Sequence, residues 1–241
     1  YARREDGVVL CCTYRREEEL IGWTRWNDTL NGTVESISKN TNSPEDEVWM
    51  IFKRTINGMT KRYVEKKRPQ DFGFNDVTGA WFVRSGLEFD GGPKVSIPSI
   101  TNANPAVINS VAHGLIAGEK IRITGALGMT EANEVWQIAY IDVDNFSLQN
   151  PDTGTNIDST AWGVYIGSGV YEKVAKTITG LSHLNGKIVQ ILGDGSSMND
   201  KTVVAGSITV DDWVNRAIVG LKYSTKFKPM PPDFAEGFLS G

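Results

Sequence analysis

The chain has 241 residues, of which 25 are Lys or Arg and 29 are Asp or Glu, so its formal net charge is −4, and 40% of its residues are hydrophobic. This is a globular composition, and its slight acidic excess argues against a dedicated nucleic-acid binder, which needs surplus Lys and Arg to neutralise phosphates. The sequence has no apolar run of about 18 residues, so it predicts no membrane-spanning helix. No leader-like segment is recognised. Because the sequence starts at Tyr1 in a strand-like run, we expect it to be a fragment of a longer chain.

Residues 1–97 predict short antiparallel strands joined by tight turns. The clearest signal is a hairpin around Asn57-Gly58, because this pair readily adopts the positive φ angles of a two-residue turn and the flanking runs alternate apolar with polar side chains. We expect a blade-like or meander region here. Its predicted strands are residues 8–14, 20–26, 33–37, 47–54 and 60–65.

Residues 98–172 differ in composition, because charged residues become rare and Gly, Asn, Thr and Ala dominate. Such a segment between two similar flanks predicts an inserted small β-barrel domain whose ends lie close together. A helical turn is expected at residues 129–133. The predicted strands are residues 106–111, 120–124, 136–141, 145–148 and 163–166.

Residues 173–241 return to the earlier pattern and predict a β-sandwich or barrel region that continues the host domain. Residues 228–233 are rich in proline, which cannot extend a strand ladder, and predict an exit linker. The whole chain is therefore expected to be mainly β. The predicted strands of this part are residues 177–179, 187–192, 201–204, 207–210 and 217–223.

The residues that could carry chemistry do not form a catalytic, cofactor-binding or metal-binding pattern. His113 and His183 stand without neighbouring ligands, so a structural or surface role is the stronger interpretation. Cys11 and Cys12 are adjacent; a disulfide between neighbours is strained, so we expect unactivated, reduced thiols. We therefore predict no enzyme activity, no cofactor and no metal.

The acidic and glycine-rich clusters are likewise predicted to be turns. Residues 17–19 follow two arginines and favour local ion pairing, whereas residues 142–145 and 194–200 lack the full ligand spacing of a calcium loop. The glycines at 167–169 and 193–195 do not join a strand to a helix, as a phosphate loop requires.

Basic residues cluster on the predicted hairpin, with Trp49 and Tyr63 nearby. Two interpretations are open: contact with nucleic acid through cations and aromatic rings, or a solvated or subunit-facing hairpin neutralised by acidic neighbours. The second is favoured. The basic residues are Lys53, Arg54, Lys61, Arg62, Lys66, Lys67 and Arg68, and the expected acidic neighbours are Glu45, Asp46, Glu47 and Glu65.

Several sequence motifs in this order resemble the tail tubular (nozzle) proteins of short-tailed bacteriophages. They are the motifs at residues 10–26, 32–37, 46–54, 62–65, 85–91 and 177–187. The insert resembles small β domains of phage proteins named after the first catalytic-cysteine half-domain of ubiquitin-activating enzymes. The insert has no cysteine, so thioester chemistry is excluded there. The resemblance implies an assembly role without catalysis.

The first functional hypothesis is thus a structural tail protein, assembled in the host cytoplasm and located in the virion tail, that forms part of the conduit for DNA ejection. Its partners would be copies of itself in a ring and other tail proteins, with at most weak, transient DNA contact. The alternative is a module that binds host-surface glycans through Trp136 and Trp162 on the insert. An enzyme acting on cell-wall polysaccharide is least favoured, because no paired carboxylates are recognised.

Overall fold

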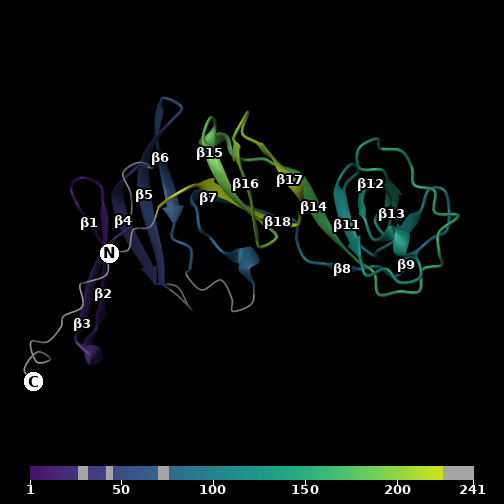
Figure 1. The fold of residues 1–241 in the computed structure, drawn as a ribbon, viewed down its shortest axis with the longest axis horizontal. Coiled ribbons are helices and arrows are strands. Elements are labelled where there is room, and N and C mark those ends of the chain that lie inside the picture. The colour runs from purple at the N-terminus through teal and green to yellow at the C-terminus, as the bar shows by residue number, and fades with distance from the viewer. Residues whose placement is uncertain (27–31, 42–45, 70–75, 225–241) are drawn as a thin grey trace, which may run out of the picture.

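The computed structural model describes residues 1–26, 32–41, 46–69 and 76–224 (Figure 1). The described chain is built from antiparallel strands with short 3-10 turns, which confirms the mainly β fold predicted from the sequence. The predicted linker at residues 228–233 lies outside the described residues. The 3-10 turns are η1 (Arg16–Glu18), η3 (Val77–Gly79), η4 (Thr130–Ala132) and η5 (Ser182–Leu184).

The N-terminal part forms two three-stranded antiparallel sheets rather than one continuous meander, with strand orders β1-β2-β3 and β4-β5-β6. The two sheets enclose a first core of Val9, Val34, Val48, Met50 and Phe52. The strands are β1 (Ala2–Arg3), β2 (Val9–Arg15), β3 (Leu20–Arg25), β4 (Thr33–Thr41), β5 (Asp46–Ile56) and β6 (Met59–Lys66).

The β5–β6 hairpin is confirmed. Asn57 and Gly58 have φ angles of 50° and 74°, the left-handed values that a tight turn requires. Side chains from Val48 to Ile56 of β5 alternate strictly between buried and exposed, as the sequence pattern predicts for a strand with one covered face. Ile56 at the end of β5 belongs to a second core, so the hairpin joins the first part of the chain to the next.

The second core lies between a four-stranded sheet of order β16-β15-β18-β7 and the paired strands β14 and β17. This arrangement agrees with the sandwich-like region expected near the C-terminus. Its largest fully buried members are Ile178, Leu181 and Leu184. The strands are β7 (Arg84–Asp90), β14 (Val170–Ile178), β15 (Ile188–Gly193), β16 (Ser196–Thr202), β17 (Ile208–Val214) and β18 (Arg216–Leu221).

The middle of the chain forms a curled sheet of order β14-β11-β12-β13-β10-β9, and not the closed barrel that we expected. The segment that would close the ring is split, since β8 pairs with β14 and β9 pairs with β10. Pro98, which has no N–H to donate, lies where the segment changes partner from β14 to β10. The new strands are β8 (Val95–Ser96), β9 (Ser99–Ile100), β10 (Val107–Asn109), β11 (Lys120–Thr124), β12 (Val135–Asp142) and β13 (Asn145–Gln149).

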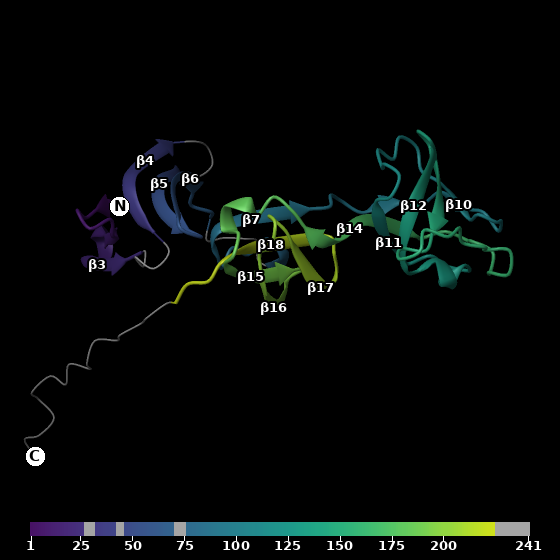
Figure 2. The ribbon, with the colours of Figure 1, turned by 90° about the horizontal axis from the view of Figure 1, so that it is seen from above.

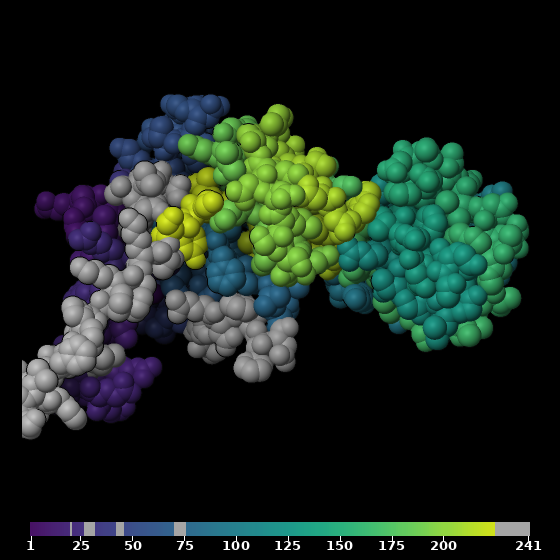
Figure 3. All heavy atoms as spheres, viewed as in Figure 1, coloured from purple at the N-terminus to yellow at the C-terminus, as the bar shows by residue number. Residues whose placement is uncertain are grey.

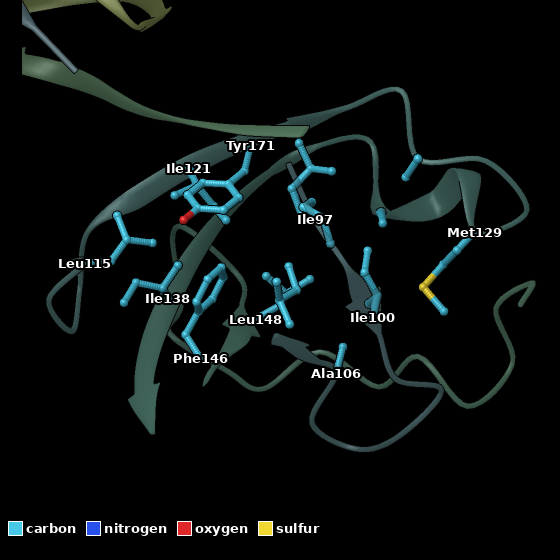
Figure 4. Packing of buried hydrophobic residues seen from close by; sticks show 14 residues of the cluster. Ile97, Ile100, Ala106, Leu115, Ile121, Met129, Ile138, Phe146, Leu148 and Tyr171 are labelled. Atoms are coloured by element: carbon cyan, nitrogen blue, oxygen red, sulfur yellow. The ribbon is translucent and has the colours of Figure 1, made fainter. Parts of the chain in front are cut away.

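The curled sheet encloses a third core, in which the rings of Phe146 and Tyr171 pack edge to face (Figure 4). Their ring centres are 5.6 Å apart. The expected helical turn is confirmed as η4. The strand predicted at residues 163–166 is wrong: only an isolated bridge joins Leu127 to Gly167. Val164 and Ile166 are 71% and 74% exposed, so this apolar run does not have the covered face that strand periodicity implies.

The three groups of strands that enclose the three cores lie in a row (Figure 2). Figure 3 shows the middle segment as a rounded body joined to the rest by a narrow waist. Strand β14 crosses this waist, because its first half pairs with β8 and β11 and its second half pairs with β17. The predicted boundary at 172/173 falls inside β14, and the division into domains stays a prediction. No helix among the described residues is long and apolar enough to span a membrane.

Candidate functional site

Both histidines serve as structural hydrogen-bonding groups. The Nδ1 atom of His113 accepts from the backbone N–H of Leu115 at 3.0 Å, and its Nε2 atom lies 2.9 Å from the carbonyl oxygen of Asp142. His183 places Nε2 3.0 Å from the carbonyl oxygen of Ser85. The two rings therefore fix loops against strands, and the structure does not bring them together.

The two thiols are free and lie on β2, with Cys11 partly buried and Cys12 exposed. Consecutive strand residues point to opposite faces of a sheet, so the two sulfurs face apart. Among the described residues no group of three or more His, Cys, Asp or Glu side chains could hold a metal ion.

Several cations of the basic hairpin are neutralised by carboxylates of its own sheet, β4-β5-β6. Arg62 donates two hydrogen bonds to Glu35, at 2.6 and 3.2 Å. Lys66 pairs with Glu47, which also accepts from the indole N–H of Trp49 at 3.1 Å.

These contacts perturb the carboxyl groups in the direction expected for ion pairs. The hydrogen bond from Arg62 lowers the pKa of Glu35, and the bonds from Lys66 and then Trp49 lower the pKa of Glu47. Both carboxylates are therefore held in the charged form, which suits ion pairing and not proton transfer.

Sequence reasoning identified only some of these partners. Glu47 and Glu65 act as expected, whereas Asp46 pairs with Lys39 on the neighbouring strand. Glu35 and Glu88, which pair with Arg62 and Arg68, were not anticipated because they come from strands distant in sequence. Glu45 lies outside the described residues.

Arg54 is the buried member of this hairpin, with only 1% of its side chain exposed. Its Nε and Nη2 atoms both donate to Glu65 at 2.7 Å, and its guanidinium lies 4.2 Å from the ring centre of Phe52. A bidentate pair of this kind fixes both charge and orientation. Arg54 is thus a structural group of the first core and is not accessible to a phosphate.

A second polar cluster joins the curled sheet to the second core. Arg122 on β11 donates to Glu172 at 3.1 Å, to Asp194 at 3.3 Å and to the carbonyl oxygen of Trp213. The other carboxylate oxygen of Asp194 accepts from the backbone N–H groups of Asn215 and Arg216, at 3.0 and 2.8 Å. Through these bonds Arg122 and Asp194 connect β11 and β14 on one side of the waist with the end of β17 and the start of β18 on the other.

The aromatic pair considered for glycan binding is not freely exposed. Trp136 and Trp162 are partly buried and pack against the third core, with ring centres 5.8 Å apart. The indole N–H of Trp136 donates to the carbonyl oxygen of Ala132 at 2.8 Å. A sugar-stacking platform needs an open ring face, so this geometry does not favour the glycan-binding alternative.

No protein-family model and no curated protein matches the sequence. The likeness to tail tubular proteins accordingly remains an interpretation of the motifs. Among solved structures, the chain is similar to the Phage phi92 endosialidase, with 17% sequence identity and a TM-score of 0.19. The match covers 70% of this chain and 26% of that protein, so the chain spans about a quarter of its length. A TM-score this low transfers neither fold details nor activity.

Proposed function

We propose that the protein is a structural component of a bacteriophage tail, of the nozzle or tubular type, that forms part of the conduit for DNA ejection. The observation that carries the proposal is the ordered series of motifs in residues 10–65. These motifs occupy strands β2 to β6, where their residues build a core and its ion pairs. Motif residues with such roles are suited to a scaffold.

The charge distribution on the β5–β6 hairpin favours a role as a conduit rather than as a DNA-binding module. Each phosphate contact adds affinity and salt dependence, and tight contacts would slow the passage of DNA. Arg54, Arg62 and Lys66 are each paired with a carboxylate, so few cations remain to hold phosphates. DNA binding should therefore be at the non-specific level, with a dissociation constant of roughly 0.1 mM near physiological salt.

The test uses the full-length protein and purified phage particles. We expect the protein to be present in particles by mass spectrometry and to form a ring, visible by electron cryo-microscopy of the tail. Fluorescence anisotropy with duplex DNA should show only weak, salt-sensitive binding. A full-length chain that is monomeric and absent from particles would contradict the proposal, as would sub-micromolar DNA binding that persists at physiological salt.

A further inference from the structure

The β2–β3 hairpin carries an apolar face on one side. The strand register places Cys12 opposite Trp23 and Tyr14 opposite Ile21, so these four side chains are neighbours on one face. Tyr14, Ile21 and Trp23 are 61%, 63% and 62% exposed. A two-stranded hairpin is only marginally stable alone. We call these four residues the hairpin face.

A second apolar face lies on the β5–β6 hairpin. Ile51 is directly opposite Val64, and Trp49 precedes Ile51 by two positions on the same side of the strand. Val64 is 69% exposed, and Trp49 and Ile51 are each 36% exposed. We call these three residues the outer face, because they point away from the core side of β5. Lys53, Arg62 and Lys66 lie beside it, and Arg62 and Lys66 are neutralised there by Glu35 and Glu47.

The two faces cannot cover each other within one chain. Val9 at the base of the β2–β3 hairpin packs into the first core, with Trp26 against it, on the inner side of the β4–β6 sheet. The outer face lies on the opposite side of that same sheet. Contact between the hairpin faces of two copies would leave both outer faces exposed, whereas packing the hairpin face of one copy on the outer face of another covers both kinds of face, and only the head-to-tail form of that contact can build a ring.

We propose that the hairpin face of one copy packs on the outer face of a second copy of this chain, in a head-to-tail contact. At the tip of the β2–β3 hairpin, Arg16, Glu17 and Glu19 lie outside the ion pairs found among the described residues and together carry one net negative charge. Lys53 beside the outer face also lies outside those ion pairs. The two faces therefore carry opposite charge, which favours their contact. This inference rests on the proposed ring assembly and names the surfaces that would build it.

The size of the contact determines how it must be detected. From their exposed fractions, the hairpin face presents roughly 400 Å² and the outer face roughly 250 Å². Their sum is below the ~1,200 Å² at which stable interfaces begin. A single pair of copies should therefore dissociate readily, while ring closure engages both faces of every copy at once. Covalent trapping is the appropriate assay.

Cys12 supplies a natural reporter on the hairpin face. In a Cys11→Ser background, Val64→Cys adds a thiol to the outer face, and diamide oxidises two thiols that meet to a disulfide. We expect a ladder of dimers, trimers and larger species on non-reducing gels. The ladder should be lost when Cys12→Ser is added, and reduced at least fivefold by Trp23→Ser.

The matched control is Val111→Cys in the same background, because Val111 is 74% exposed and lies in the turn that follows β10, far from both faces in the sequence. Ile51→Cys provides a second reporter on the outer face, and circular dichroism verifies the fold of each variant. Equal crosslinking of the control, or no ladder from either reporter, would overturn the proposal. Dimers that form without the added thiol, and no larger species with it, would mean that hairpin faces meet symmetrically, which would also overturn it.

The failure of this contact and the failure of the proposed function are distinguishable. A ring in purified particles whose neighbouring copies meet through other surfaces would refute the contact and leave the function standing. A Cys12-dependent ladder from a protein that is absent from particles would refute the function and leave the contact standing.

Discussion

The ion pair between Arg54 and Glu65 provides the sharpest test of how the first core is held together. Glu65→Ala leaves the Arg54 guanidinium 1% exposed and without its bidentate acceptor. Removing one partner of a buried pair typically costs 3–5 kcal/mol, because a charge remains buried without compensation. The hydrophobic residues around it cannot replace the carboxylate. We therefore expect a loss of about 3 kcal/mol or more in the free energy of opening the β5–β6 hairpin.

Hydrogen exchange followed by mass spectrometry measures this opening locally, which suits a chain with three separate cores. Amides of β5 and β6 should exchange roughly a hundredfold faster in Glu65→Ala. The matched control is Glu47→Ala, which breaks the more exposed pair with Lys66, at 22% and 36% exposure, and should speed exchange far less, because solvent screens this pair. The double variant Arg54→Met/Glu65→Leu should recover most of the protection. If Glu65→Ala changed exchange no more than Glu47→Ala does, the argument from burial would be refuted.

Three further predictions concern the waist. Arg122→Ala should speed exchange in β14 and cost about 1–3 kcal/mol, because the 7%-exposed Glu172 loses its cation; an unchanged exchange pattern would contradict this. Gly91→Ala should cost about 2 kcal/mol or more in urea unfolding, since an added Cβ would lie 2.2 Å from the carbonyl oxygen of Lys173, and a neutral effect would show that this approach is not tight. Replacing residues 98–172 with a short Gly-Ser linker should leave the remaining chain folded, because β8 pairs with β14 and brings both ends of the segment side by side. Loss of cooperative unfolding after that replacement would count against the boundary.

The fold class and the β5–β6 hairpin were predictable because both depend on local signals. The alternation of apolar and polar residues along 47–54 and the Asn57-Gly58 pair each depend on only a few neighbouring residues. The structure shows both the strand and the turn that they predict. The run at residues 163–166 carried a similar local signal yet forms only an isolated bridge. Its apolar side chains lack a covering layer, and strand formation depends on such a layer more than on composition.

The change of partner between β8 and β9 was not predictable from local patterns. Pro98 interrupts a segment whose two halves pair with strands on either side of the gap. From the sequence, this proline was only the start of a change in composition. Its position at a change of partner becomes visible only once β10 and β14 are known to lie on either side of it.

The polar clusters were the least predictable features, since their members are far apart in sequence. Arg122 and Asp194 are separated by 72 residues, and nothing near either one signals the other. Asp194 was interpreted as a turn residue, and it does occupy a turn with a φ angle of 47°. Its carboxylate in addition accepts hydrogen bonds from two backbone N–H groups and from Arg122. A side chain that satisfies donors from three elements fixes their mutual orientation, so the waist is held by specific polar contacts as well as by the continuity of β14. If copies do meet through their hairpin and outer faces, this orientation also sets where the curled sheet projects from the assembly.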